Sequence, residues 1–509
     1  MLKAVKYPAL LIPFLYFSCS ETHTEIPETE KDFCQSIHRN DSLSLSKELE
    51  PLAEQLKDKT GAYVLEDGGT SLVTRAWLCE YAEKTIDIQY FIFSTDNVGL
   101  IACDYLIRAA DRGVKVRILV DDIMVDAGIH EILSMDSHEN IEIKIYNPGC
   151  NLGKSIFGKL KKLGSDFHGF NQRMHNKTFT VDGKVVITGG RNIADEYFDY
   201  DHEFNFRDRD ILFVGKAVTT VQNSFEKFWN DSICKPVTEL VEDKEDDFSS
   251  PSRYELLHQY ACDPKNFWPQ VRERIQNLPK AFKHIRESGE LIWTDSLTFI
   301  SDDPGKNRDR IRGGITTDSL ISLVKQAKTS VDIQSPYLIV TELGLNLFKE
   351  TVKRGVKVRI LTNSLASNDN LEAFSGYKSC RNQLLEAGVK IYEFKPDAKE
   401  RYKVMTGELQ QKMNFTPVFG LHAKSMVIDG KTTVIGTFNL DPRSANLNTE
   451  CITVIRSQKL TEGVLKGMEE EFKPENSWET TLTFNPDDKA DKTRQLKAWT
   501  KKVVPKEIL

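Results

Sequence analysis

The chain has 509 residues, more than one ordinary hydrophobic core accommodates, which predicts two domains of ordinary size. Hydrophobic residues make up 40% and charged residues 28% of the sequence, and this balance indicates a soluble globular body. The net charge of −7 argues against a protein whose main task is to wrap DNA, although a local basic groove is compatible with it.

Residues 1–19 have the order of an export signal. Lys3 and Lys6 precede a short apolar run, and small residues around Cys19 follow it. The run is too short to cross a bilayer as a stable helix, so an uncleaved hydrophobic anchor is the alternative. Cys19 resembles the lipidated cysteine of bacterial lipoproteins. We expect an exported, membrane-associated bacterial protein in which residues 20–55 form a polar arm.

Residues 56–240 predict an α/β unit. Apolar and polar residues alternate over 86–90, and an apolar run continues to 93, as in a strand that becomes buried. Apolar side chains recur at helical spacing over 100–109, and residues 114–120 predict the next strand. The order strand, helix, strand indicates a parallel βαβ crossover.

A basic amphipathic stretch occupies residues 154–170, where lysines interleave with large apolar residues. Such a stretch could lie on an anionic bilayer surface near an active-site mouth. It could equally be an ordinary helix that packs its apolar stripe on the body. The sequence leaves both interpretations open.

The segment after this stretch carries residues suited to catalysis. His175 and Lys177 are two residues apart in a strand-like segment, so both side chains project from one face. Asp182 and the glycine after it have the tight-turn signature of a β-hairpin, and the returning strand ends at Gly189 and Asn192. The hairpin brings these residues back beside His175, where glycine lets a phosphate approach and asparagine adds donors.

The same set recurs 247 residues later as His422, Lys424, Asp429, Gly436 and Asn439. The octamer at 112–119 also recurs, letter for letter, at 354–361, so a whole unit is duplicated. We therefore expect a linker region at 241–290, a second half at 291–475 and a C-terminal extension at 476–509.

A duplicated His/Lys/Asn set points to one composite site for a phosphate diester, in which one imidazole attacks and the other donates a proton. Each histidine needs an acceptor that orients it. Glu450 opens the strand after the second motif and is the candidate there, and Asp208 is its counterpart in the first half. Asp182 and Asp429 belong to the motif, but we interpret them as structural turn carboxylates rather than proton carriers.

These motifs resemble those of the phospholipase D superfamily, whose members carry two His-Lys-Asp motifs. The resemblance implies an α/β fold of two tandem α/β/α halves, with mixed sheets flanked by helices and a pseudo-twofold axis through one shared active site. It also implies a phosphohistidine intermediate. We assign His175 as nucleophile and His422 as general acid/base, and the reverse order stays open.

The family mechanism implies that lysine and asparagine hold the non-bridging phosphate oxygens; the residues concerned are Lys177, Lys424, Asn192 and Asn439. The mechanism requires no cofactor and no metal. The nine cysteines show no Cys-x-x-Cys spacing and no cluster with histidine, which agrees with that expectation.

The flanks at 173–177, 189–198 and 438–450 resemble those of bacterial cardiolipin synthases, and among these the C type. This resemblance implies a monomeric phosphatidyltransferase that acts at a membrane surface on phosphatidylglycerol, with phosphatidylethanolamine as a second candidate substrate. The alternative is a phospholipase D that releases phosphatidic acid, because only the second nucleophile differs. The acidic balance and the export signal disfavour a nuclease, so no nucleic acid partner is expected.

Overall fold

The computed structural model describes residues 44–122, 129–149, 171–240, 251–278, 281–306, 313–405 and 417–500. The predicted signal segment with Cys19 and the amphipathic stretch at 154–170 lie outside these ranges. Within them, no helix combines the length and the apolar character that a membrane crossing requires.

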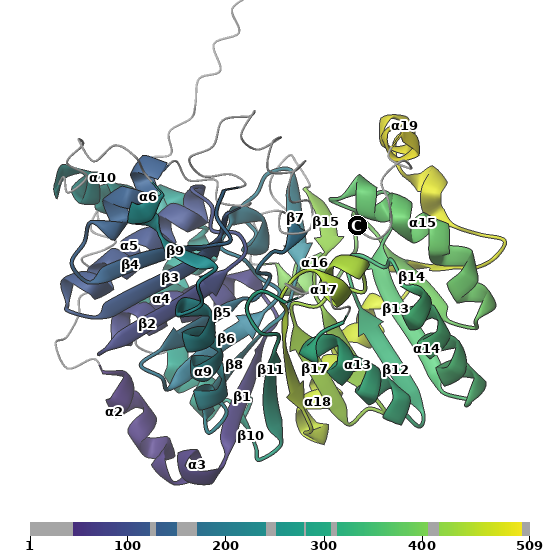
Figure 1. The fold of residues 1–509 in the computed structure, drawn as a ribbon, viewed down its shortest axis with the longest axis horizontal. Helices are drawn as coiled ribbons and strands as arrows, with labels where there is room; N and C mark the ends of the chain where they lie inside the picture. Colours follow the sequence, from purple (N-terminus) through teal and green to yellow (C-terminus); the bar gives the residue numbers. More distant parts are fainter. Residues whose placement is uncertain are drawn as a thin grey trace, which may run out of the picture.

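The first half is built from a mixed sheet and its covering helices (Figure 1). Its strands are β1 (Thr60–Leu65), β2 (Thr85–Tyr90), β3 (Lys115–Asp121), β4 (Ile141–Tyr146), β5 (Thr178–Val181), β6 (Val185–Gly189), β7 (Phe204–Arg207), β8 (Asp210–Gly215), β9 (Cys234–Pro236) and β10 (Ile292–Thr294). Its helices are α2 (Leu45–Leu49), α3 (Ala53–Asp58), α4 (Gly68–Tyr81), α5 (Asn97–Asp111), α6 (Ile129–Asp136), α9 (Val218–Trp229), α10 (Pro251–Ala261), α11 (Pro269–Gln276) and α12 (Ala281–Glu287).

The second half repeats this construction. Its strands are β11 (Leu297–Ser301), β12 (Ser330–Gln334), β13 (Lys357–Asn363), β14 (Lys390–Phe394), β15 (Val418–Leu421), β16 (Ser425–Ile428), β17 (Thr432–Gly436), β18 (Cys451–Ile455) and β19 (Ser477–Thr480). Its helices are α13 (Ile315–Gln326), α14 (Glu342–Lys353), α15 (Leu371–Glu386), α16 (Arg401–Val404), α17 (Pro442–Asn446), α18 (Gln458–Glu471) and α19 (Lys492–Thr500).

The two large sheets share one strand order over eight strands, and the first sheet has β10 as an additional edge strand. The first runs β10-β1-β8-β6-β5-β2-β3-β4-β9, and the second runs β11-β18-β17-β16-β12-β13-β14-β19. The predicted βαβ crossover is present in both, since β2 pairs parallel with β3 and β12 pairs parallel with β13. The predicted motif hairpins are also present, as β5–β6 and β16–β17. The expected duplicated α/β architecture is therefore confirmed.

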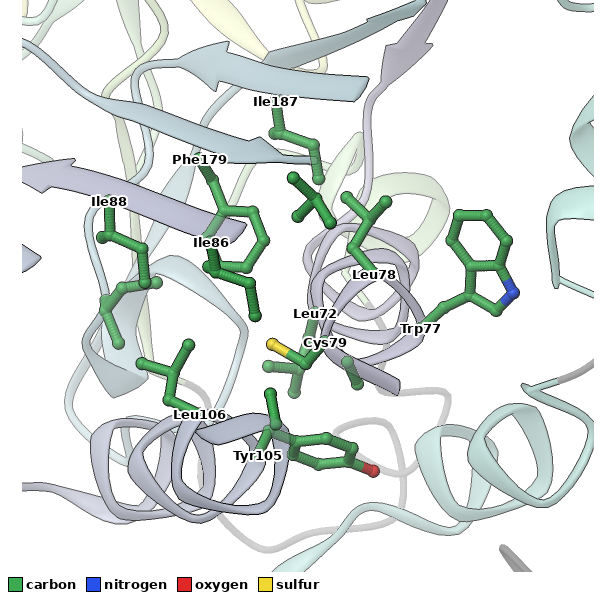
Figure 2. Close-up of a cluster of buried hydrophobic side chains, with 14 of the residues drawn as sticks. Leu72, Trp77, Leu78, Cys79, Ile86, Ile88, Tyr105, Leu106, Phe179 and Ile187 are labelled. Atoms are coloured by element: carbon green, nitrogen blue, oxygen red, sulfur yellow. The ribbon is translucent and has the colours of Figure 1, made fainter. Parts of the chain in front are cut away.

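Hydrophobic burial explains the layers. In the first half, α4 and α5 present apolar side chains to one face of the sheet, and Figure 2 shows Leu72, Leu78 and Leu106 meeting Ile86 and Phe179 there. A separate core contains residues of both halves, from β8 and β6 on one side and from β13, β16, β17 and β18 on the other. The halves therefore share a core as well as a boundary, and Figure 1 shows them side by side.

The boundary between the halves falls between β10 and β11, because β10 pairs with β1 and β11 pairs with β18. Much of the segment expected as a linker therefore belongs to the first half: buried side chains of α11 and α12 join its core. The expected C-terminal extension begins with β19, which completes the second sheet beside β14.

Asp182 and Asp429 occupy the turns of the two motif hairpins, both at positive φ, 52° and 53°. The Asp182 carboxylate accepts backbone N–H bonds from residues 83–85, and the Asp429 carboxylate accepts them from residues 328–330. Each aspartate thus fixes the chain where it enters β2 or β12. These contacts support a structural role for both carboxylates.

Replacing Asp429 separates its two structural contributions. Asp429→Ala removes the acceptor of three backbone N–H groups and places alanine at a left-handed φ, so we expect a loss of about 2–3 kcal/mol in the free energy of unfolding. Asp429→Asn keeps a residue that tolerates this φ and retains one oxygen, so the loss should be near 1 kcal/mol. Urea unfolding followed by circular dichroism measures both. An alanine variant as stable as the parent contradicts the structural role.

Candidate active site

Each motif histidine is carried by a segment that is hydrogen-bonded to the opposite half. The backbone N–H of His175 donates to the Thr449 carbonyl at 3.0 Å. The backbone N–H of His422 donates to the Arg207 carbonyl at 2.8 Å. Just before His422, β15 pairs parallel with β7, in register from Val418–Phe204 to Leu421–Arg207. The candidate active site therefore lies where the halves exchange backbone hydrogen bonds.

The orienting carboxylates also cross between the halves. Glu450 of the second half accepts from His175 Nδ1 at 2.9 Å, and Asp208 of the first half accepts from His422 Nδ1 at 2.6 Å. The expectation that each carboxylate serves the histidine of its own half is wrong. The physical reason is the strand pairing: Thr449 lies beside Met174, and Arg207 lies beside Leu421, so each carboxylate follows a residue that faces the other motif.

Both imidazoles are buried and held neutral. Burial lowers the pKa of His175 to about 4, and the charge of Lys177 acts in the same direction. Burial and the neighbouring Lys424 ammonium lower the pKa of His422 to about 3. Because each Nδ1 points to a carboxylate, the proton of the neutral ring belongs on Nδ1 and Nε2 is left with its lone pair.

The two lysines lie in the same site. Lys177 is 1% exposed and Lys424 is 4% exposed, and each ammonium donates to the carbonyl of its motif histidine, at 2.8 and 2.6 Å. Burial and the charge of Lys424 lower the pKa of Lys177 to about 7. Burial lowers the pKa of Lys424 to about 8, against the opposing pull of Asp208 and other carboxylates. A buried cationic pair of this kind suits an anionic phosphate diester.

The two motif asparagines differ. The Asn192 side chain accepts from the Ile92 backbone N–H at 3.0 Å and donates to the Tyr197 hydroxyl at 2.8 Å. Asn439 is 5% exposed, and its Oδ1 has no hydrogen-bond partner among the described residues. Asn439 is therefore the better placed to turn its amide toward a substrate, whereas Asn192 fixes neighbouring parts of the protein.

The motif glycines leave room for protein atoms. A β-carbon on Gly189 would collide with the Asp210 carboxylate and the Arg209 carbonyl, and one on Gly436 would collide with the Cys451 carbonyl. Gly190 has the same importance, since its missing side chain makes room for the Asp208 carboxylate. Close strand packing thus gives these positions a reason to be glycine that needs no phosphate.

The sequence did not reveal the residues that hold the orienting carboxylates. The Thr437 hydroxyl donates to Glu450, and the Asp302 carboxylate accepts from the Glu450 backbone N–H at 3.1 Å. The Asp208 carboxylate accepts from the Arg209 backbone N–H at 2.7 Å, and beside it the Arg207 guanidinium forms an ion pair across the interface with Glu471 at 2.5 Å. The one available signal was Arg-Asp-Arg at 207–209, a run of charges at the edge of a buried strand.

A possible metal-ligand group lies apart from these histidines. In the described part of the chain, Asp104, His258 and Cys262 bring one ligand atom each to within 4.8 Å of one another. Cys262 is disulfide-bonded, so it supplies no thiolate. The His258 imidazole lies 2.9 Å from the Asp104 carboxylate and forms an ordinary hydrogen bond with it. This group adds nothing to the diester site.

Comparison with known proteins agrees with the duplicated architecture. The family model for the PLD-like domain of cardiolipin synthase matches residues 78–229 and 320–473, one match in each half. This chain belongs to the cardiolipin synthase family of phospholipase D-like proteins. The resemblance inferred from the motifs is confirmed, and so is the expectation of an enzyme of the cardiolipin synthase type.

The similarity covers most of the chain. Cardiolipin synthase C of Escherichia coli (strain K12) is 35% identical over 416 residues, 81% of this chain and 85% of that protein. Cardiolipin synthase 1 of Bacillus anthracis is 26% identical over 420 residues, 82% of this chain and 67% of that protein. The solved phosphatidylserine synthase of Haemophilus influenzae Rd KW20 has a TM-score of 0.56 at 14% identity, over 90% of this chain and 99% of its own, and shares the fold.

The crossed carboxylates predict that each half controls the histidine of the other. Glu450→Gln removes the charge that holds His175 in one tautomer, and we expect kcat to fall about 10² to 10⁴-fold. Asp208→Asn should act similarly through His422. Glu393→Gln is the matched control, because Glu393 is a buried carboxylate bonded to Tyr377 and Arg381, away from both histidines. A Glu450→Gln enzyme with parental kcat contradicts the assigned contact.

The lysine pKa values predict a pH limit. Burial lowers the pKa of Lys177 to about 7 and that of Lys424 to about 8, so kcat/KM should fall as pH rises through this window. The sign follows from charge: above its pKa each lysine is neutral and no longer attracts the diester anion. Bound substrate raises both pKa values, so the fall in kcat lies at higher pH. Lys177→Arg should move the fall in kcat/KM to higher pH. If the fall stays at the same pH, Lys177 is not its source.

Proposed function

We propose that the protein is a phosphatidyltransferase of the cardiolipin synthase type, which moves a phosphatidyl group between phospholipids through a phosphohistidine. The candidate substrates are phosphatidylglycerol and, as a second donor, phosphatidylethanolamine. Membership of the cardiolipin synthase family supports the substrate class. The observation that carries the mechanism is the pair of buried imidazoles whose Nδ1 atoms are bonded to Glu450 and Asp208.

In the first step, His175 Nε2 attacks the phosphorus of the donor lipid. A P–N bond forms, and the P–O bond to the headgroup alcohol breaks. The departing alkoxide takes a proton from His422 Nε2. Burial lowers the pKa of His422 to about 3, and the negative charge of the bound diester raises it so that the ring carries this proton.

In the second step, the terminal hydroxyl of phosphatidylglycerol gives its proton to His422 Nε2, and its oxygen attacks the phosphorus. The P–N bond breaks, His175 is regenerated and cardiolipin is released. During both steps Lys177, Lys424 and Asn439 hold the non-bridging oxygens. If water replaces the lipid hydroxyl, the same site yields phosphatidic acid, which is the hydrolase alternative.

We also propose that the enzyme acts as an exported, membrane-associated monomer. The duplicated halves form both parts of the site within one chain, which supports the monomer. The disulfide-bonded Cys262 is typical of an oxidising compartment and supports export, as the N-terminal signal pattern does. Lipidation of Cys19 would supply the membrane attachment.

A lipid transfer assay tests the proposed reaction. Purified protein is incubated with labelled phosphatidylglycerol, with and without phosphatidylethanolamine, and the lipid products are resolved. We expect cardiolipin, and we expect His175→Ala to lower its formation at least about 10³-fold, as loss of a nucleophile does. Phosphatidic acid as the sole product favours the hydrolase. DNA cleavage without lipid turnover contradicts the proposal.

Trapping of the covalent intermediate identifies the nucleophile. His422→Ala removes the base of the second step, so the covalent intermediate should accumulate when a good leaving group replaces the headgroup alcohol. Phosphatidyl-p-nitrophenol provides this leaving group, and mass spectrometry of the digested protein locates the added phosphatidyl mass. We expect the mass on the peptide with His175. Modification of His422 in the reciprocal His175→Ala variant reverses the two roles.

A further inference from the structure

The loop after β13 begins directly beside the second motif. The Asn363 side chain donates to the Leu421 carbonyl at 2.8 Å and accepts from the Leu421 backbone N–H at 2.7 Å. Leu421 immediately precedes His422. Ser364 and Ser367 hydrogen-bond to each other and keep the loop compact. The loop ends at Asn370, whose side chain caps the N-terminus of α15. The exposed residue just before this cap is Asp369.

Tyr337 reaches Asp369 from the end of β12. Its hydroxyl donates to the Asp369 carboxylate at 2.6 Å. The backbone after Tyr337 is fixed to the motif, because Leu338 bridges Leu440 and the Ile339 N–H donates to the Leu440 carbonyl at 2.7 Å. Asn439, the amide with an unpartnered buried oxygen, precedes Leu440. Tyr337 and Asp369 therefore flank the second-half side of the site.

The charge of Asp369 reaches the catalytic groups. It is among the carboxylates that oppose the lowering of the Lys424 pKa by burial. It also acts on Tyr197, whose ring packs edge-on against His422 with centroids 5.1 Å apart. The carboxylate thus belongs to the surroundings of His422 rather than to a remote surface.

Tyr337 has no phenolic equivalent at the aligned position of the first half. The repeat that aligns Gln89 with Gln334 places Ile92 at the position of Tyr337. Ile92 has an aliphatic side chain, so the first-half side lacks the phenol. A symmetric diester site must still distinguish a lipid-bearing oxygen from a headgroup oxygen. The Tyr337 phenol, which the aligned first-half position lacks, supplies such a distinction by holding the Asp369 carboxylate.

We propose that Asp369, held by Tyr337, is a specificity-determining residue that binds the small headgroup alcohol on the His422 side of the site. The assignment rests on the proposed function, because His422 protonates the leaving alcohol and activates the incoming one. The Tyr337 hydroxyl and the Asp369 backbone N–H use two of the roughly four acceptor positions of this carboxylate. The other acceptor positions can bind the hydroxyls of a glycerol group or the ammonium of an ethanolamine group. Both headgroups carry hydrogen-bond donors, and these donors are what the carboxylate recognises.

Partitioning of the covalent intermediate tests the proposal. Short-chain phosphatidyl-p-nitrophenol loads the histidine, and p-nitrophenol release reports that step. Glycerol, ethanolamine and 1-propanol then compete with water, and the resulting phosphatidyl alcohols are quantified. The parent should prefer glycerol or ethanolamine over 1-propanol, which lacks additional donors. Asp369→Asn should lower that preference about tenfold, the worth of one charge-assisted hydrogen bond.

Further variants separate binding from structure. Asp369→Glu keeps the charge and should recover part of the preference, and Tyr337→Phe should lower it a few-fold because the carboxylate remains. Asp488→Asn is the matched control, since Asp488 has a side chain 70% exposed and is paired with Lys489 at the surface. The larger of the glycerol and ethanolamine losses identifies which headgroup the site prefers.

The outcomes are distinguishable. An Asp369→Asn enzyme that turns over lipid with parental preference for both alcohols overturns this assignment alone, and so does a parent that shows no preference over 1-propanol. A parent that forms no covalent phosphatidyl-enzyme and releases no p-nitrophenol overturns the proposed function, and this assignment with it.

Discussion

The hydrogen bonds between each motif imidazole and a carboxylate of the other half are the constraint on which this structure depends. His175 is oriented by Glu450, and His422 is oriented by Asp208. For both bonds to form together, the two sheets must be held in one relative position. The shared apolar core, the pairing of β7 with β15 and the ion pair of Arg207 with Glu471 provide that rigidity.

The same arrangement explains how so much charge is tolerated in a buried site. Two lysines and two imidazoles lie among residues that exclude water, and burial alone favours their neutral forms. Asp208 and Glu450 partly balance the cations, and interactions with the motif histidines keep the pKa of both carboxyl groups below its usual value despite their burial. The anionic phosphate of a substrate adds the negative charge that balances the remaining positive charge. Electrostatics therefore favours the substrate complex over the free enzyme.

The sequence predicted the local features well, because they depend on residues close together in the chain. Alternation and turn chemistry placed the hairpins around Asp182 and Asp429, and the repeated octamer revealed the duplication. The crossing of Glu450 and Asp208 could not be read in this way. It depends on which segments of two separate sheets meet, and a motif that repeats within each half carries no information about pairing between them. The same holds for Asn192, whose amide is used by Ile92 and Tyr197.

The sequence separation of these crossed bonds also has a consequence for biosynthesis. Glu450 lies 275 residues after the histidine that it orients. A growing chain that has already exposed His175 therefore carries an unoriented imidazole until nearly all of the second half has been made and folded. We therefore expect an unfinished or truncated copy to cleave phospholipids far more slowly than the complete chain. Catalytic competence is thus coupled to completion of the chain, without any separate inhibitor.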